Sequence, residues 1–362
     1  MRKVLDVPQQ YVSDARHLLN STVVYLQQPI YFQRPISIQI IDNARIIANA
    51  LGMQGASNNS LSYQLSILRP VETEGVGLHT AVRSHIRLVP APPDTGIVFR
   101  RVDLDNFEIE AHGRNVARVS YATSLMKNGV LLSTTEHLLA ALYSCGIDNV
   151  YVEINALELP ILDGSAQPFM DLLDRAGVRQ LRRQRRYLKV VKPLEISEGD
   201  RRIGIYPADE FRVRCYIEFP HPMIGQQETE IAVTRDTFSR ELASARTFTF
   251  TEDIDRLRAM GLIRGGSLEN AIVLTPDGLL EGSLRFPNEF SRHKALDLIG
   301  DLALIGLPLQ ALVVAHKAGH ALHTRLVSKL LAEPSHWIET TSAAASDSAA
   351  HTIEDPSPVH AD

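Results

Sequence analysis

The stretch FSRHKALDLIGDL, Phe290–Leu302, indicates a core helix that contains several candidate functional side chains. Its apolar residues predict a helix that packs into the core. His293, Asp297 and Asp301 are four positions apart, so they form one line along that helix. A histidine and two carboxylates therefore share one face of a largely apolar helix.

The two carboxylates on this face repel each other, by about 0.2–0.5 kcal/mol on an exposed helix and by more where they are partly buried. A metal ion bound by His293 and Asp297 would remove this repulsion. Asp301 would then pair with another group, such as a histidine. The alternative is an ordinary His–Asp pair at helical spacing beside a solvated third acid. The segment alone leaves both interpretations open.

A second segment, Ser133–Leu139, places Glu136 and His137 in the first turn of another apolar helix. Leu138, Leu139, Ala141, Leu142 and Cys145 continue it at helical spacing, and Gly146 is placed to end it. Ser133 and Glu136 also have the spacing of a capping box, which alone would explain the glutamate. For this segment by itself, that structural interpretation is favoured over a catalytic one.

A third segment, Ala315–Leu322, contains His320. The apolar strand Ala311–Ala315 leads to Gly319, and a helical pattern follows, so His320 lies at a strand-to-helix turn where functional side chains are common. The helix N-terminus would lower its pKa, whereas a nearby Asp301 would raise it. For this segment by itself, an ordinary turn histidine is the favoured interpretation.

Together the segments supply His137, His293 and Asp297, three ligands that leave a fourth position for water, as catalytic zinc sites do. Glu136 adjoins His137 and can accept a proton from that water. The combination predicts a hydrolytic zinc site. Sites of His and carboxylate ligands accept several metals, so Fe²⁺ is an alternative to Zn²⁺.

The composition is that of a globular protein: 44% of the residues are hydrophobic and 22% are charged. The formal net charge of -5 gives no electrostatic reason to bind nucleic acid. Cys145 and Cys215 are too few for a disulfide framework and fit a reducing compartment. No apolar run approaches the ~18 residues of a membrane span, and the N-terminus lacks the apolar core of a secretory signal.

The sequence divides into segments of different character. Residues 1–60 are expected to be an N-terminal extension, poorly ordered or an artefact of the gene model. Strand and helix signals then fall in two blocks, 61–183 and 187–335, with strand patterns at Ser84–Leu88, Val150–Ile154 and Phe211–Phe219. The polar tail 338–362 is expected to be disordered. Separate runs of strands and helices predict an α+β fold with two domains.

Eight short motifs, in one order, resemble those of the UDP-3-O-acyl-N-acetylglucosamine deacetylases, which commit bacteria to making lipid A. Each is weak alone, but together they cover residues 61–332 and are specific. They are Glu74–His79, Thr135–Leu139, Gly146–Asn149, Leu162–Ala166, Ala245–Phe248, Gly265–Ala271, His293–Asp301 and Lys317–His320.

The resemblance implies two α+β domains, each a sheet layered with helices, with the active site between them. It implies a zinc ion on His137, His293 and Asp297, and Glu136 as the general base toward the attacking water. His320, protonated and oriented by Asp301, would steady developing charge and act as general acid toward the leaving amine.

The same resemblance implies substrate contacts. Thr247 would donate a hydrogen bond to the oxyanion, Phe248 would stack near the sugar or nucleotide, and Lys294 would meet phosphate or hydroxyl groups. The insert from about Thr249 to Asn288 would form an apolar passage for the fatty acyl chain. Gly265 would either let backbone approach the acyl chain or only turn the polypeptide. Plain packing of a small helix is the alternative for the apolar residues of the insert.

The expected substrate is an acylated UDP-sugar, and the expected enzyme is a zinc-dependent amide hydrolase. A metal-dependent amidase with another substrate, or a binding protein without chemistry, are the alternatives. The family implies a bacterial cytoplasmic protein, most simply a monomer, although the N-terminal extension leaves organellar targeting open.

Overall fold

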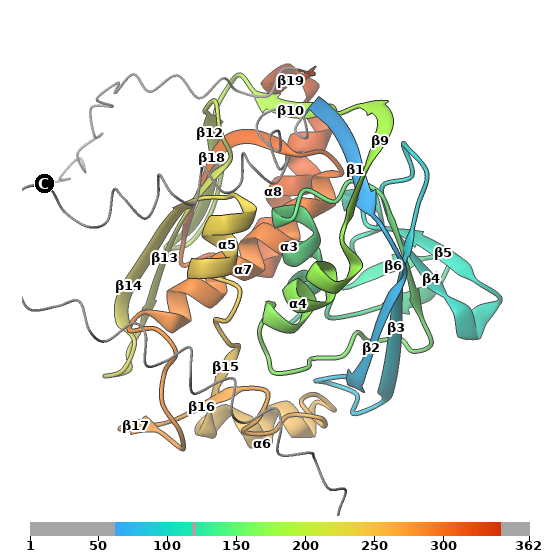
Figure 1. The fold of residues 1–362 in the computed structure, drawn as a ribbon. Coiled ribbons are helices and arrows are strands. Elements are labelled where there is room, and N and C mark those ends of the chain that lie inside the picture. Colours follow the sequence, from blue (N-terminus) through green and yellow to red (C-terminus); the bar gives the residue numbers. More distant parts are fainter. Residues whose placement is uncertain (1–61, 118–120, 342–362) are drawn as a thin grey trace, which may run out of the picture. The chain divides into compact units, whose positions relative to one another are not determined.

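The computed structural model describes residues 62–117 and 121–341 of the chain. The predicted extension 1–60 and nearly all of the predicted tail lie outside the described residues. The fold is α+β, as predicted, with two main sheets layered with helices (Figure 1). The division into two domains remains a prediction; buried apolar residues from both sheets form one continuous cluster.

The first main sheet has five strands in the order β2-β3-β8-β4-β5. Strands β3 and β8 contain the two segments predicted from alternating residues, and alternate side chains of both are buried. The bounds are β2 Val71–Val76, β3 Arg83–Pro90, β4 Ile97–Arg101, β5 Phe107–Glu110 and β8 Val150–Ile154.

The second main sheet has seven strands, and β18 lies at its centre. It pairs antiparallel with β12 and parallel with β10 and β13. Ala311, Val313 and Ala315 on one face of this strand are buried, whereas Leu312 and Val314 on the other face are only partly buried. The bounds are β10 Tyr187–Val190, β11 Leu194–Glu198, β12 Arg201–Pro207, β13 Arg212–Phe219, β14 Gly225–Ala232, β18 Leu309–His316 and β19 Trp337–Thr340.

Strand β19 corrects one predicted boundary. Its residues pair antiparallel with β10, from Trp337 opposite Val190 to Thr340 opposite Tyr187. The disordered tail expected from residue 338 therefore overlaps an edge strand. The Ala-, Ser- and Asp-rich composition that suggested disorder begins only after this strand, whose sequence is Trp-Ile-Glu-Thr.

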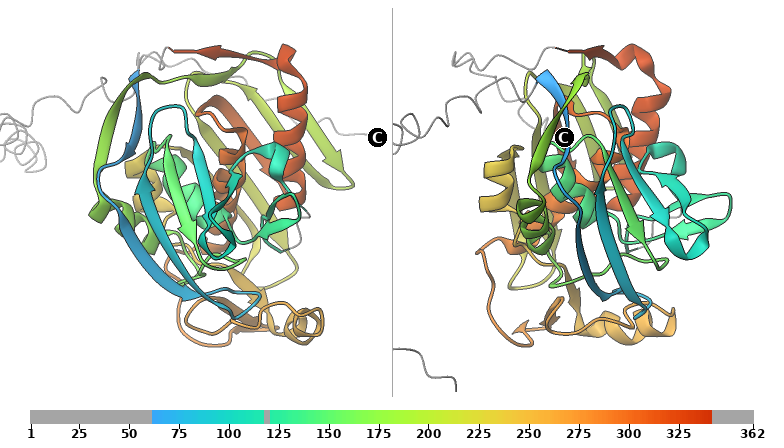
Figure 2. Two further views of the ribbon diagram at one scale, coloured as in Figure 1. Left: turned by 90° about the vertical axis from the view of Figure 1, so that its right-hand side faces the viewer. Right: turned by 45° about the vertical axis from the view of Figure 1, so that its right-hand side comes forward.

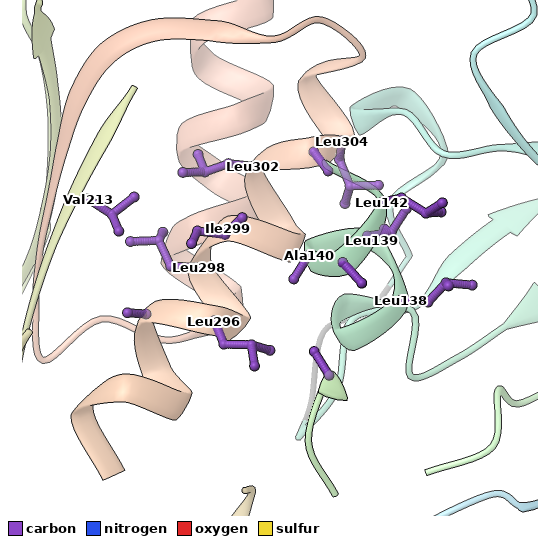
Figure 3. Packing of buried hydrophobic residues seen from close by; sticks show 14 of the residues in the cluster. Leu138, Leu139, Ala140, Leu142, Val213, Leu296, Leu298, Ile299, Leu302 and Leu304 are labelled. Carbon is purple, nitrogen blue, oxygen red and sulfur yellow. The ribbon is translucent and has the colours of Figure 1, made fainter. Parts of the chain in front are cut away.

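Two helices, α3 (Glu136–Ser144) and α7 (Glu289–Leu302), pack against each other between the main sheets (Figures 1 and 3). All residues of α7 except Arg292 and Lys294 are buried, and all of α3 except Tyr143. A helix that is buried on nearly every side suits the middle of a layered fold. Apart from Arg292, Lys294 and Tyr143, the ionisable residues of α3 and α7 are therefore held inside the protein.

Three further helices cover the sheets: α4 (Gln167–Ala176), α5 (Arg235–Glu241) and α8 (His320–Ala332). Gly146 and Gly177 follow the ends of α3 and α4 with φ of +70° and +65°, a conformation that favours glycine, and Gly146 was predicted to end its helix. None of the described helices combines the length and apolar character needed to cross a membrane.

Three short sheets complete the fold. One joins β1 (Tyr63–Ile67) to β9 (Val178–Gln184), and a hairpin joins β6 (Leu125–Lys127) to β7 (Val130–Leu132). The third lies in the predicted insert. Its elements are β15 Phe248–Phe250, α6 Thr251–Ala259, β16 Ile272–Thr275 and β17 Gly278–Leu279.

The insert lies at the opposite end of the described fold from β10 and β19 (Figures 1 and 2). Two backbone hydrogen bonds connect the loop between α6 and β16 to the loop after β2. The Arg264 N–H donates to the carbonyl of His79, and the Gly265 N–H donates to that of Leu78. A Cβ on Gly265 would lie 2.2 Å from the carbonyl oxygen of Gly77. Glycine is therefore required for this close contact.

Candidate active site

Three buried side chains from α3 and α7 converge on one point. His137 Nε2 lies 3.5 Å from Asp297 Oδ1, and His293 Nε2 lies 3.4 Å from the same oxygen. All three ligand atoms lie within 4.8 Å of one another. Ligands at about 2.0–2.2 Å from a tetrahedral zinc ion are separated by about 3.4 Å, so the spacing of these atoms fits zinc.

The hydrogen bonds and pKa values of this group also suit a metal. His293 Nδ1 lies 3.0 Å from the carbonyl oxygen of Ala245, which as an acceptor leaves Nε2 with its lone pair toward the other ligands. Burial lowers the pKa of His293 to about 3, so the ring is neutral. Burial would raise the pKa of Asp297, but its neighbours, including the Lys294 ammonium group that donates to it, hold that pKa well below its usual range.

Gly300 allows α3 and α7 to approach closely enough for this site to form. A Cβ on Gly300 would lie 2.1 Å from the carbonyl oxygen of Glu136 and 3.0 Å from its Cα. Both atoms belong to the backbone at the start of α3, one residue before His137. The helices therefore meet at the point where their ligands do.

The structure rejects the capping-box interpretation of Glu136. Glu136 is the first residue of α3, two positions too early for that motif, and the N-cap Thr135 makes no side-chain cap hydrogen bond. Thr134 has a positive φ of 61°, so the chain turns sharply after Ser133. The Glu136 carboxylate is buried, and burial raises its pKa.

His320, the first residue of α8, pairs with Asp301 of α7. Its Nδ1 lies 2.7 Å from Asp301 Oδ2, and the Asp301 side chain is fully buried. Burial alone would lower the pKa of His320, but the charge and hydrogen bond of Asp301 raise it to about 9. The imidazole is therefore protonated at neutral pH.

A small pocket of about 30 Å³ gathers most of the residues singled out in the sequence. These are Glu136, His137, Thr247, His293, Lys294, Asp297 and His320. Asp301 lies behind His320. The groups suited to hold a metal, accept a proton and donate one therefore face a common space.

A larger pocket of about 280 Å³ adjoins the small one, since Leu78, His79, Tyr121 and Thr247 line both. The insert supplies much of its wall, including Ile254, Leu257, Ile263 and Val273, and Phe248 also lines it. The predicted apolar passage thus corresponds to a pocket that opens beside the candidate metal ligands.

Lys294 and Gly265, which were expected to contact the substrate, both contact other parts of the protein. Lys294 Nζ donates to Asp297 Oδ2 at 2.9 Å and lies 5.6 Å from the Phe248 ring centre, so it faces the metal ligand. Gly265 is not among the described residues that line either pocket. Its contact is with the loop after β2, so the structure gives no support for a direct contact with the acyl chain.

Sequence reasoning missed two residues beside Asp301. His323 Nδ1 lies 2.8 Å from Asp301 Oδ2, and the Thr123 hydroxyl donates to Asp301 Oδ1. His323 was detectable, because it follows His320 by three positions and so shares its helix face. Thr123 lies between β5 and β6 in a stretch with no motif, and only the folded chain brings it near.

Comparison with known proteins identifies the family. The sequence matches the model of the family described as LpxC, UDP-3-O-acyl N-acetylglycosamine deacetylase, over residues 64–332. The chain belongs to the LpxC family. Members are zinc-dependent amide hydrolases, and the buried group His137, His293 and Asp297 fits such a metal site.

Individual LpxC relatives match over nearly their whole length. The UDP-3-O-acyl-N-acetylglucosamine deacetylase of Solibacter usitatus (strain Ellin6076) is 54% identical over 276 residues, which are 76% of this chain and 93% of the relative. Proteins with the same description from Anaeromyxobacter sp. (strain Fw109-5) and Myxococcus xanthus (strain DK1622) are 48% and 45% identical, over 89% and 87% of their lengths. Both alignments cover 75% of this chain.

Proposed function

We propose that this chain hydrolyses the N-acetyl group of UDP-3-O-acyl-N-acetylglucosamine and releases acetate, a step in lipid A synthesis. The observation that carries the proposal is the convergence of a three-ligand metal group, a buried carboxylate and a protonated histidine on one pocket, beside a second, largely apolar pocket. Membership of the LpxC family supports the choice of substrate.

His137, His293 and Asp297 would hold the zinc ion. When bound, zinc polarises the acetamide carbonyl and lowers the pKa of water toward neutrality. Glu136 is the residue on this pocket that can take a proton from the attacking water, because its carboxylate adjoins the ligand group. Lys294 offsets the negative charge of Asp297 across their 2.9 Å hydrogen bond.

His320 supplies the acid that amide cleavage requires. An amine leaves only after its nitrogen gains a proton, and the Asp301 carboxylate keeps His320 protonated at neutral pH. The same positive charge favours the negative charge that develops on the amide oxygen. Thr247 lines both pockets, and its hydroxyl would donate a hydrogen bond to that oxygen.

The larger pocket would hold the 3-O-acyl chain. Most of its wall is apolar. Burial of the acyl chain there contributes about 0.8 kcal/mol per CH₂ group to substrate binding. Phe248 lines this pocket next to Thr247, and Lys294 Nζ lies 5.6 Å from its ring centre, so its ring would contact the sugar that joins the acyl chain to the acetamide.

The function is tested by assaying purified protein on UDP-3-O-acyl-N-acetylglucosamine and on UDP-N-acetylglucosamine without the acyl chain. We expect acetate release from the acylated substrate only, its loss after treatment with a zinc chelator, and its return when zinc is restored. Equal rates on both substrates would refute the lipid assignment, and full activity in the metal-free protein would refute the zinc assignment.

The acyl pocket is tested by replacing Ile254 with Trp, which narrows it from the side of α6. Overfilling a packed space costs about 1–3 kcal/mol, which corresponds to a roughly 5- to 150-fold loss in kcat/KM. We expect this loss with long-chain substrates and a smaller one with short-chain analogues. Asp255→Trp is the matched control, since Asp255 is exposed on the same helix. An equal loss for every chain length would contradict the assignment.

A further inference from the structure

Thr123 makes contacts on both sides of the proposed catalytic machinery. The residue is fully buried. Its backbone N–H donates to Glu136 Oε2 at 3.1 Å, and its side-chain hydroxyl donates to Asp301 Oδ1. The hydroxyl oxygen also lies 3.2 Å from His320 Nδ1. One residue thus links the proposed base to the Asp–His pair that supplies the proposed acid.

The Asp301 carboxylate depends on Thr123 for its orientation. His320 and His323 both approach the same oxygen, Oδ2, with their Nδ1 atoms. Thr123 is the donor to Oδ1 among the described residues. The terminal torsion of an aspartate side chain has broad energy minima, so two bonds to one oxygen leave the carboxylate free to rotate. A third bond to the other oxygen fixes its plane.

The backbone of Thr123 is itself tied to the start of α3. Its carbonyl oxygen accepts hydrogen bonds from the backbone N–H and the hydroxyl of Thr135, both at 3.3 Å. Thr135 directly precedes Glu136. The Thr123 hydroxyl is therefore held in the frame of α3, whereas the carboxylate that it contacts belongs to α7.

We propose that Thr123 is a positioning residue that fixes Asp301, and through it His320, relative to Glu136. The proposal rests on the proposed function, in which Glu136 and His320 act on one amide. Base and acid must both be placed within a fraction of an ångström for such a reaction, because small displacements of reacting groups cost large factors in rate. Through its hydroxyl, Thr123 would hold the Asp301–His320 pair of α7 and α8 in a fixed position relative to α3.

A purely structural role for the hydroxyl makes a different prediction. In that case it only satisfies a buried carboxylate, and its removal lowers the thermal stability without changing the turnover of folded, zinc-loaded protein. A positioning role requires that turnover itself changes. The two roles are therefore separated by kcat measured per zinc-loaded molecule.

The test compares Thr123→Val, which keeps the shape but removes the hydroxyl, with Thr123→Ser, which keeps the hydroxyl. For Thr123→Val we expect a fall in kcat of about 10–100-fold, by analogy with the loss of a hydrogen-bond partner that orients a metal ligand. KM and zinc content should change little. Thr123→Ser should recover most of the loss. Near-normal kcat in Thr123→Val, or equal loss in both variants, would overturn the proposal.

A second measurement does not depend on turnover. In metal-free protein with ¹⁵N-labelled histidine, the Nδ1–H resonance of His320 reports its hydrogen bond to Asp301. We expect this resonance to shift or broaden in Thr123→Val and to return in Thr123→Ser; an unchanged resonance in Thr123→Val would refute the positioning role. An inactive wild-type protein would instead count against the proposed function, and the resonance would still decide the role of Thr123.

Discussion

Replacing Glu136 with Gln should reduce kcat by about 10²–10⁴-fold, the range for loss of a positioned general base. The amide side chain keeps an oxygen that accepts the hydrogen bond from the Thr123 N–H. It cannot accept the proton of the attacking water. Steady-state acetate release on the acylated UDP-sugar measures the effect.

The fold of this variant should be retained. Burial raises the pKa of Glu136, so the protein disfavours its charged form, and a neutral amide of the same shape is tolerated there. Thermal unfolding and zinc analysis supply the controls and should both match the wild type. Activity within a few-fold of the wild type in this folded, zinc-loaded variant would rule Glu136 out as the base.

The second large effect is expected from Gly300→Ala. In the interior of an ordinary helix this change stabilises a protein by about 1 kcal/mol. Here the added Cβ would lie 2.1 Å from a backbone oxygen of α3, which cannot move aside as a flexible side chain would. Overpacking costs about 1–3 kcal/mol or more, so we expect a net loss of stability and a lower Tm.

Zinc binding should weaken in the same variant. The clash would push α3 away from α7 beside His137, and the ligand atoms would no longer meet at tetrahedral spacing. Zinc content after dialysis measures the loss of zinc binding, and the Tm of the metal-free protein measures the loss of stability. Gly278→Ala is the matched control, because its added Cβ meets nothing within 4 Å. A Gly300 variant with normal zinc content would show that the contact does not set the site.

Local patterns in the sequence predicted much of this fold. Helical spacing from Leu138 to Cys145 and the following Gly146 predicted α3, and alternation predicted β8 at its observed bounds. The line His293, Asp297 and Asp301 correctly predicted that these residues share a helix and that Asp301 contacts a histidine. Such patterns are informative because the residues that make them are close in the chain.

Contacts between distant segments could not be predicted in the same way. The capping-box spacing at Ser133 was misleading, because the positive φ of Thr134 starts the helix later than a sequence pattern indicates. Gly300 was noted as part of a motif, but only the crossing of two helices shows why a side chain is excluded there. Thr123 meets Asp301 through a hydroxyl whose partner lies 178 positions away.

The proposed metal ligands come from two helices that the ribosome makes at very different times. His137 leaves the exit tunnel while α7, with the other two ligands, has still to be translated. A growing chain therefore cannot bind zinc with all three proposed ligands until Asp297 has emerged. Zinc binding then closes a long loop, and its free energy stabilises the fold only in the last stage of folding.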